Sequence, residues 1–292
     1  MIKMYSNKWY ILIFVLPALI LFCGVLIAPI GASAYYSFFD WNGLSTKTFI
    51  GLDNYKELFT SDSIGFNRAL RNALLLAGLS VFLQLPLALA LALALGKGIK
   101  GERIFLSVFF MPVLISTVVI GQLWVKIYNP DYGVLNVALR SVGLDNLTQI
   151  WLGDTSTALA AVFVPILWQY VGYHMLLLYA GVKSVPTELR EAAMLDGASD
   201  GQVDRYIVLP YIKPIIKISV IFAVTGSLKS FDLIYVLTNG GPLHSTEVPS
   251  TLMISMLFLR NRYGMGSTIA VLLIILCFAF ALLISVIFKE ED

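Results

Sequence analysis

Long apolar stretches alternate with shorter polar segments along this chain. Six mostly apolar stretches reach roughly 20 residues, the length that a helix needs to cross the hydrocarbon core of a bilayer. The predicted transmembrane helices are residues 9–30, 72–95, 104–128, 157–182, 212–237 and 268–288. The pattern predicts an all-α polytopic membrane protein with one domain, residues 1–292. The first stretch exceeds the apolar part of a signal peptide and lacks a small-residue cleavage site, so we expect a retained span.

The composition supports a membrane protein and excludes several other classes. Hydrophobic residues make up 58% of the chain and charged residues 13%, which is not the composition of an ordinary water-soluble domain. The formal net charge of +2 is too small to indicate a nucleic acid partner. Cys23 and Cys277 both lie in apolar stretches, so we expect neither a disulfide framework nor a metal site.

A polar segment, residues 184–214, separates the fourth and fifth predicted spans. Pro186 suits the first turn of a helix, where its missing N–H would be unpaired in any case. Residues 188–195 are mostly good helix formers, and Gly197 can end the helix. The first half of the polar segment therefore predicts a short helix that stops at a glycine.

A second short helix is predicted after that glycine. Ser199 and Gln202 have the spacing of a capping box, so the helix should begin near Asp200 and end at Pro210. The surface of the polar segment combines small residues with carboxylates, namely Ala192, Ala193, Ala198, Glu191, Asp196 and Asp204. Such a surface favours contact with a protein partner. The alternative is a cytoplasmic loop that needs only charges and a turn.

Lysine and arginine residues near the span ends predict the orientation. Their bias is clearest in the tight loop 96–103, which carries Lys97, Lys100 and Arg103. It places this loop, the polar segment and both chain termini on the cytoplasmic side. The segments expected to face outward are residues 31–71, 129–156 and 238–267.

The order of residues in the polar segment is similar to a known pattern. Glu191-Ala192-Ala193 is followed by Asp196-Gly197-Ala198, then by Leu209-Pro210 and Lys213-Pro214. This order resembles the EAA loop of binding-protein-dependent ABC importers, in its sugar-permease form. Gly201 and Asp204 stand where that family often has aromatic residues. Shorter matches extend the resemblance over nearly the whole chain, among them Asp53-Asn54, Arg71-Asn72, Met111-Pro112 and Asn239-Gly240-Gly241-Pro242.

The resemblance implies a type I ABC importer permease fold and a role for the polar segment. Residues 186–197 would form a coupling helix in a groove of an ABC ATPase subunit, where Glu191 would pair with a basic residue. The residues expected to carry coupling are Glu188, Glu191, Ala192, Ala193, Asp196, Gly197 and Ala198. ATP and Mg²⁺ would bind to the ATPase partner, and no cofactor is expected in this chain.

The resemblance also implies a substrate and partners. The chain would pass a sugar, a related polyol or a sugar phosphate across a bacterial-type cytoplasmic membrane. It would pair with a second, related permease, contact two ABC ATPase subunits and receive substrate from an extracytoplasmic binding protein. Gly240, Gly241 and Pro242 are candidates for docking that binding protein, and a structural turn is the equal alternative.

Polar groups inside spans are costly in lipid and usually face a bundle interior or a watery cavity. The candidates for a translocation path are Gln84, Gln122, Trp168, Gln169, Tyr173, His174, Lys229 and Asp232. Hydrogen bonding between helices is the commoner role for Gln84 and Gln122. Lys229 and Asp232 are three residues apart on one helical face, so we expect them to neutralise each other. His174 alone does not predict a metal site.

Two other classes of protein are open to test. A polytopic enzyme would need catalytic groups gathered at one depth, and the sequence has no HExxH or GxSxG pattern. Gly96-Lys97-Gly98 lacks the other residues of a phosphate loop, so we expect a tight turn there. An ion-coupled secondary transporter of a small polar solute would be favoured by an internal repeat, which we do not find between the two halves.

Overall fold

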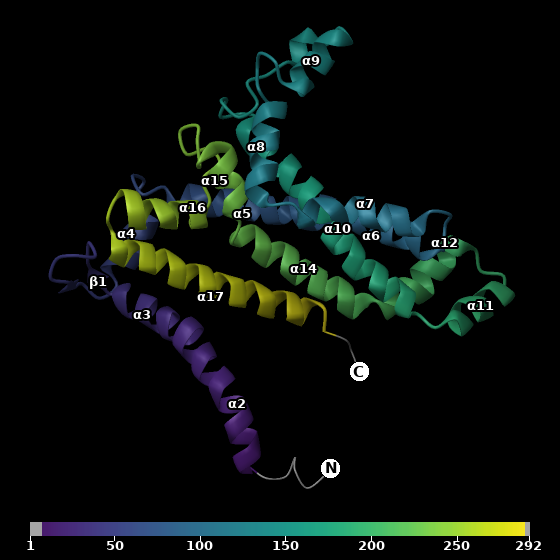
Figure 1. Ribbon diagram of the computed structural model, residues 1–292, viewed down its shortest axis with the longest axis horizontal. Helices are drawn as coiled ribbons and strands as arrows, with labels where there is room; N and C mark the ends of the chain where they lie inside the picture. Colours follow the sequence, from purple (N-terminus) through teal and green to yellow (C-terminus); the bar gives the residue numbers. More distant parts are fainter. Residues whose placement is uncertain (1–7, 290–292) are drawn as a thin grey trace. The chain divides into compact units, whose positions relative to one another are not determined.

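The computed structural model describes residues 8–289, and its ordered segments in that range are helices apart from two strands of two residues each (Figure 1). These residues form two compact units. Unit 1 contains residues 8–64 and 253–274, and unit 2 contains residues 65–252 and 275–289. The predicted helical membrane fold is confirmed. The action of both units as one permease domain stays a prediction, and the predicted cytoplasmic ends, including Lys3, lie outside the described residues.

Unit 1 contains a long apolar helix and a small hairpin. The helix consists of α2 (Lys8–Phe22), the π turn η1 (Cys23–Ile27) and α3 (Ala28–Tyr36). The other elements are β1 (Phe39–Asp40), β2 (Thr48–Phe49), α4 (Asp53–Thr60), η5 (Ser255–Leu259) and the first half of α17 (Tyr263–Ile287). The two strands are antiparallel, with Phe39 opposite Phe49.

Side-chain hydrogen bonds fasten the hairpin region of unit 1. The Asn54 amide donates to the carbonyl oxygens of Ser37 and Phe39, both at 2.9 Å. Arg262 forms two parallel bonds to the Glu57 carboxylate, at 2.8 and 2.6 Å. Because a guanidinium and a carboxylate match in shape, this pair fixes orientation as well as distance. The contacts join α4 to the end of α3 and to the start of α17.

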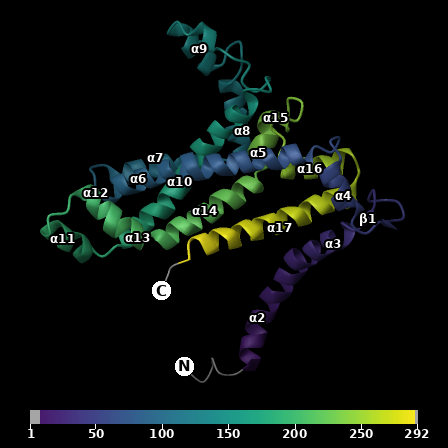
Figure 2. The ribbon, with the colours of Figure 1, turned by 180° about the vertical axis from the view of Figure 1, so that it is seen from behind.

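Unit 2 contains most of the helices. In chain order its elements are α5 (Phe66–Leu79), η2 (Ser80–Gln84), α6 (Leu85–Gly96), α7 (Glu102–Leu114), α8 (Thr117–Ile127), α9 (Val134–Ser141), η3 (Asp145–Leu147), α10 (Ala158–Ser184), α11 (Thr187–Leu195), α12 (Asp200–Val203), η4 (Asp204–Val208), α13 (Leu209–Tyr211), α14 (Lys213–Leu228) and α15 (Asp232–Thr238). α16 (Pro249–Ile254) begins in this unit. α6 and α7 pack along α10, and α14 packs along α5 (Figures 1 and 2).

Small residues allow the helices of unit 2 to approach closely. Ala88 and Ala92 of α6 are fully buried against Met175 of α10. A Cβ on Gly172 of α10 would lie only 1.9 Å from the carbonyl oxygen of Phe109 in α7. Glycine at this position is therefore required by a backbone-to-backbone contact, which is the packing that small residues provide between membrane helices.

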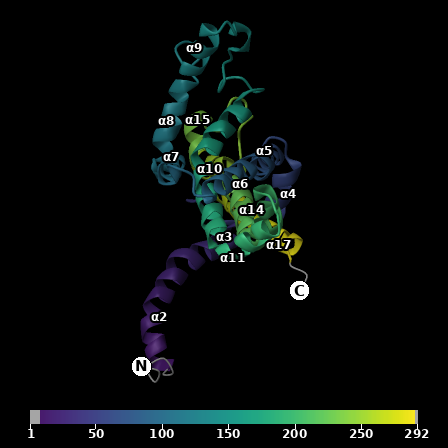
Figure 3. The same cartoon turned by 90° about the vertical axis from the view of Figure 1, so that its right-hand side faces the viewer.

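Five helices are long and apolar enough to cross a membrane within the described residues. They cover residues 13–36, 66–96, 158–184, 213–238 and 263–287. The predicted third span, residues 104–128, consists of two helices separated by a sharp bend. α7 and α8 meet at 95° (Figure 3), and they supply a sixth span only if the bent pair is counted as one.

The bend between α7 and α8 has an identifiable backbone cause. Pro112 lies in the last turn of α7 and cannot donate to the carbonyl oxygen of residue 108, which weakens that turn. Ile115 and Ser116 are extended, with ψ of 140° and 130°. The apolar pattern conceals this break because both half-helices are apolar.

Prolines occur inside several helices without ending them. In three helices a π turn comes two residues before a proline: η1 precedes Pro29, η2 precedes Pro86 and η4 precedes Pro210. Proline has no N–H and its ring crowds the carbonyl of the preceding turn, and a locally wider turn relieves that crowding. The predicted end of the second short helix at Pro210 is therefore corrected, because the helix continues through it to Tyr211.

Candidate functional site

A cavity of about 480 Å³ lies between the spans of unit 2. Its walls come from α5, η2, α10, α14 and α15, together with the bend between α7 and α8. The polar and aromatic side chains on these walls are Ser80, Gln84, Thr117, Tyr170, Tyr173, His174, Phe222, Thr225, Ser227, Lys229, Ser230, Phe231 and Asp232. Five of the predicted path residues are thus brought together, namely Gln84, Tyr173, His174, Lys229 and Asp232.

Two buried groups on the cavity wall have no hydrogen-bond partner among the described residues. Gln84 is 2% exposed and its Nε2 is unpaired, and His174 is 5% exposed with its Nδ1 unpaired. An unsatisfied buried polar atom costs free energy, so native structures normally pair such atoms with protein, water or a ligand. Both residues line the cavity, so its contents can supply the missing partners.

Aromatic rings form much of the remaining wall. The ring of Tyr173 lies 6.4 Å from that of Phe222, centroid to centroid. Phe231 stacks on Tyr235 at 5.0 Å. Tyr170 also lines the cavity. The cavity therefore combines flat apolar surfaces with amide, imidazole and hydroxyl groups.

Lys229 and Asp232 do not lie on one continuous helical face, so that expectation is wrong. α14 ends at Leu228, and α15 begins at Asp232 after Phe231 adopts φ −139° and ψ −66°. The two charged residues both line the cavity, yet no ion pair joins them among the ion pairs of the described residues. The broken helix leaves one ammonium and one carboxylate available to the cavity.

Three predicted path residues lie off the cavity wall. Gln169 is buried and donates from Nε2 to the hydroxyl of Thr117 at 3.3 Å, which joins α10 to the first residue of α8. Gln122 is exposed on α8. Trp168 packs edge-on against Trp124, with ring centroids 6.0 Å apart. In this structure Gln169 has a role between helices, and Gln122 and Trp168 do not line the cavity.

Several cavity residues were missed by sequence reasoning. Ser80 lines the cavity one helical turn before Gln84, and its hydroxyl contacts that of Ser227 at 3.2 Å. Thr117 begins α8 at the bend. The available signal was the four-residue spacing of Ser80 and Gln84, which places both on one helical face.

The polar segment folds into the two predicted short helices. α11 covers Thr187–Leu195, and Gly197 has φ +86°, a conformation that favours glycine. Pro186 is the residue before the first helical turn, one position earlier than predicted. The Ser199 N–H donates to Gln202 Oε1 at 2.8 Å, which supplies one of the two bonds of the predicted capping box.

The predicted coupling residues divide between two faces of the polar segment. Glu188, Glu191, Ala192, Asp196 and Gly197 are exposed. Ala193 and Ala198 instead pack inward on an apolar cluster that includes Val182, Val203 and Ile212. The small residues expected at a partner surface are thus partly used to seat the polar segment on its own spans.

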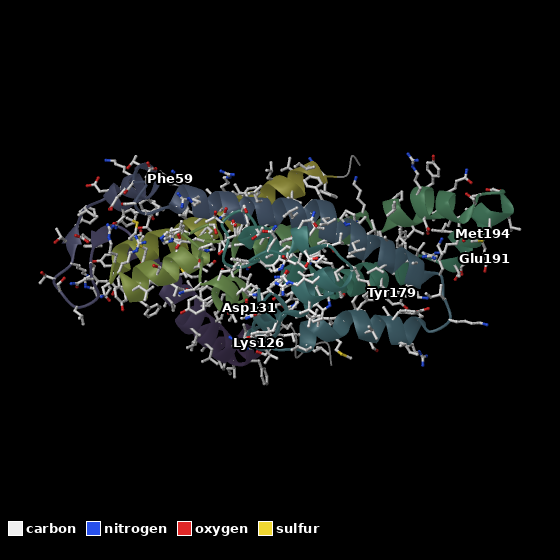
Figure 4. The ribbon with its side chains drawn as sticks, turned by 90° about the horizontal axis from the view of Figure 1, so that it is seen from above. Phe59, Lys126, Asp131, Tyr179, Glu191 and Met194 are labelled. Atoms are coloured by element: carbon white, nitrogen blue, oxygen red, sulfur yellow. The ribbon has the colours of Figure 1, made fainter. Side chains whose placement is uncertain are left out.

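The exposed face of the polar segment also carries large apolar side chains. Leu195 is 89% exposed, Tyr206 65% and Met194 49%. Figure 4 shows Glu191 and Met194 at one end of unit 2, away from Lys126 and Asp131. Arg190 fastens the first helix by donating to the carbonyl oxygen of Val182 at 2.5 Å. The polar segment is therefore anchored on one side and open on the other.

The loop after α15 forms an ordered turn. Gly240 is buried with φ +82°, and Asn72 donates to the carbonyl oxygens of Ser245 and Glu247 at 2.8 and 2.9 Å. Gly241 and Pro242 are half-buried, and the exposed tip is Leu243, at 81%. This geometry gives the three predicted residues a structural role. A docking role for them stays a prediction.

Apolar spans around a partly polar cavity, with an anchored polar segment between two of them, define a membrane permease. Residues 84–289 match the model of the family described as the binding-protein-dependent transport system inner membrane component, and the chain belongs to this family.

The chain is similar over almost its whole length to known permeases. It is 40% identical to the probable ABC transporter permease protein YurN of Bacillus subtilis, over 97% of each chain. It is 32% identical to the diacetylchitobiose uptake system permease protein NgcF of Streptomyces coelicolor, over 96% of this chain and 82% of NgcF. One chain of a bacterial ABC transporter that imports the acidic polysaccharide alginate has a similar fold, with a TM-score of 0.85, 25% identity, and 98% and 97% coverage.

These similarities confirm the predicted class, a membrane-embedded permease subunit of a sugar ABC importer. They do not favour the alternative of an ion-coupled secondary transporter. The chain is a translocating subunit of a transport system, as predicted.

Proposed function

We propose that the cavity of unit 2 is part of the path along which this permease passes a carbohydrate, either a mono- or oligosaccharide or a related polyol or sugar phosphate. The observation that carries the proposal is the unpaired Gln84 and His174 on an aromatic wall. Sugars present hydroxyl groups around an apolar ring face, so they need both planar hydrogen-bonding groups and flat apolar surfaces. The relative NgcF, which is named for diacetylchitobiose uptake, supports this substrate class.

The polar segment is proposed as the site of coupling to ATP hydrolysis. Its exposed face carries carboxylates beside apolar side chains, a composition that fits a protein partner. α10 and α14 both line the cavity, and the polar segment connects their ends. A force on the polar segment therefore reaches two cavity walls directly. The proposed coupling residues are Glu188, Glu191, Ala192, Ala193, Asp196, Gly197 and Ala198.

The proposed assembly contains a second, related permease, two ABC ATPase subunits and an extracytoplasmic solute-binding protein. ATP and Mg²⁺ bind to the ATPase subunits, and this chain holds no cofactor of its own. The membrane is a bacterial-type cytoplasmic membrane, with both chain ends and the polar segment on the cytoplasmic side. Lys97, Lys183 and Arg190 lie in or near the polar segment, and the usual excess of basic residues on the cytoplasmic side supports this orientation.

Gentle purification of the chain from its native membrane tests this assembly. We expect an ABC ATPase subunit and a second permease to be recovered with it. Glu191→Lys should abolish recovery of the ATPase, because it reverses an exposed charge on the proposed contact face. Asp145→Lys is the matched control, since it reverses an exposed charge on η3. If the ATPase subunit is still recovered with the Glu191→Lys variant, this face does not carry the coupling role.

A further inference from the structure

The loop between α6 and α7 has a fixed shape. Lys97 follows the last residue of α6, and Gly98 and Gly101 have φ of +75° and +84°. The Gly98 N–H donates to the Leu95 carbonyl oxygen at 3.1 Å. Two glycines in the left-handed conformation and a closing backbone hydrogen bond make a tight turn. The backbone at Lys97 is therefore held in one orientation.

Lys97 contacts the second short helix of the polar segment. Its Nζ lies 3.2 Å from an Asp204 carboxylate oxygen and 3.6 Å from one of Asp200. The Asp204 side chain is 19% exposed and that of Lys97 is 39% exposed. The hydrogen bond to Asp204 raises the pKa of Lys97 above its ordinary value, so the ammonium stays charged.

The far end of the loop is fastened to α10. Glu102 lies 3.3 Å from Lys183 Nζ and accepts a hydrogen bond from the hydroxyl of Tyr179. Beside Lys97, a Cβ on Gly96 would lie 2.4 Å from Val182, so α6 also touches α10 closely at this level. One loop therefore links α6 and α7 to the end of α10 and to the polar segment.

We propose that Lys97 is a positioning residue that ties the polar segment to α6 and α7 through Asp204 and Asp200. The chain itself joins the polar segment only to α10 and α14. Leu89 and Leu93 of α6 already pack against the apolar cluster that receives the polar segment. The Lys97 contact adds a polar tie to the loop between α6 and α7, so that a displacement of the polar segment moves four helices together. This inference rests on the proposed coupling function of the polar segment.

The proposal predicts uncoupling without loss of the fold. Lys97→Met keeps the length of the side chain and removes its charge. In the purified complex placed in liposomes, we expect sugar uptake per ATP hydrolysed to fall about fivefold, the scale of a partly exposed ion pair, while ATP hydrolysis continues. Lys97→Glu places like charges together and should lower the ratio further. The double variant Lys97→Glu with Asp204→Lys should recover most of it.

Lys100→Glu is the matched control, because Lys100 lies in the same exposed loop and has no ion pair among those of the described residues. It should leave the ratio unchanged. An unchanged ratio in Lys97→Glu, or an equal fall in Lys100→Glu, would overturn the positioning role.

Hydrogen exchange of the purified chain provides a readout independent of ATPase partners. Residues 198–212 should exchange faster in Lys97→Glu and return to wild-type protection in the double variant. If the wild-type chain captures no ATPase, the proposed function fails and the coupling role fails with it. The exchange result then shows separately whether the contact exists. Unchanged exchange in Lys97→Glu would overturn the contact itself.

Discussion

The cavity and the polar segment of unit 2 satisfy their polar groups in opposite ways. In the cavity, Gln84 and His174 are buried and hold unpaired nitrogen atoms. In the polar segment, Asp204 is paired with Lys97 of the neighbouring loop, Arg190 donates to a backbone carbonyl oxygen, and the other charged side chains are exposed. Unpaired buried polar groups favour the binding of a polar ligand. An exposed surface that is fixed to the transmembrane helices favours contact with a protein partner. The proposed function assigns substrate recognition to the cavity and force transfer to the polar segment.

The largest expected effect comes from the contact between α7 and α10. Gly172→Ala should destabilise the protein by about 3 kcal/mol, because its Cβ would meet the Phe109 carbonyl oxygen and force α7 from α10. The midpoint of thermal unfolding in detergent measures this. Gly78→Ala is the control, since nothing lies within 4 Å of its Cβ. Equal midpoints for both variants would contradict the close packing of α7 and α10.

A smaller effect is expected at the turn of the polar segment. Gly197→Val should cost about 1–2 kcal/mol locally, because a side chain is strained at φ +86° even though the surrounding space is open. We expect the purified chain to lose its ATPase subunit. Gly201→Val changes a helical glycine with equally open surroundings, and it should retain the subunit. If both variants lose the ATPase subunit, the size of the added side chain, rather than strain at the turn, causes the loss.

Gln84→Leu separates a ligand role from a structural role. It removes an unpaired buried amide, so stability should stay constant or rise by about 1 kcal/mol, while sugar uptake falls. Gln169→Leu should instead destabilise by about 1 kcal/mol relative to Gln84→Leu, because it removes the hydrogen bond from Nε2 to the Thr117 hydroxyl, although the Gln169 Oε1 is also buried and unpaired. Unfolding midpoints and uptake rates test both. A destabilised Gln84→Leu with unchanged uptake would make Gln84 a packing residue.

The smallest effect concerns a charge pair in unit 1. The hydrogen bond from Arg262 holds the pKa of Glu57 below its ordinary value of 4.5. The pair therefore stabilises the folded state fully above that ordinary value, and its contribution disappears as the pH falls through the lowered pKa. The midpoint of thermal unfolding should decrease between about pH 6 and about pH 3, and this decrease should be smaller in the Glu57→Gln variant than in the wild-type protein. An identical decrease in both proteins would contradict this linkage.

The two regions also differ in how far the sequence predicts them. The polar segment is contiguous, so its helix formers, Gly197 and the Ser199–Gln202 spacing indicated both short helices. Its inward-facing Ala193 and Ala198 could not be foreseen, because the apolar cluster that receives them comes from spans elsewhere in the chain.

The cavity was harder to predict because helix breaks shape it. The bend at Ser116 lies within an apolar run, where hydrophobic length gives no sign of an interruption. The break before Asp232 falls in the polar stretch 229–232, which was expected to continue one helix. Those breaks place Thr117 and Lys229 on the wall. Single polar residues such as Ser80 acquire meaning only when helices distant in sequence converge.

Transport by the reconstituted complex tests the central claim most directly. The purified chain with its co-purified subunits and binding protein would be placed in liposomes and supplied with a panel of radiolabelled neutral mono- and disaccharides. The account predicts uptake that requires ATP hydrolysis and is lowered by Gln84→Leu. Uptake that an ion gradient drives without ATP would contradict it.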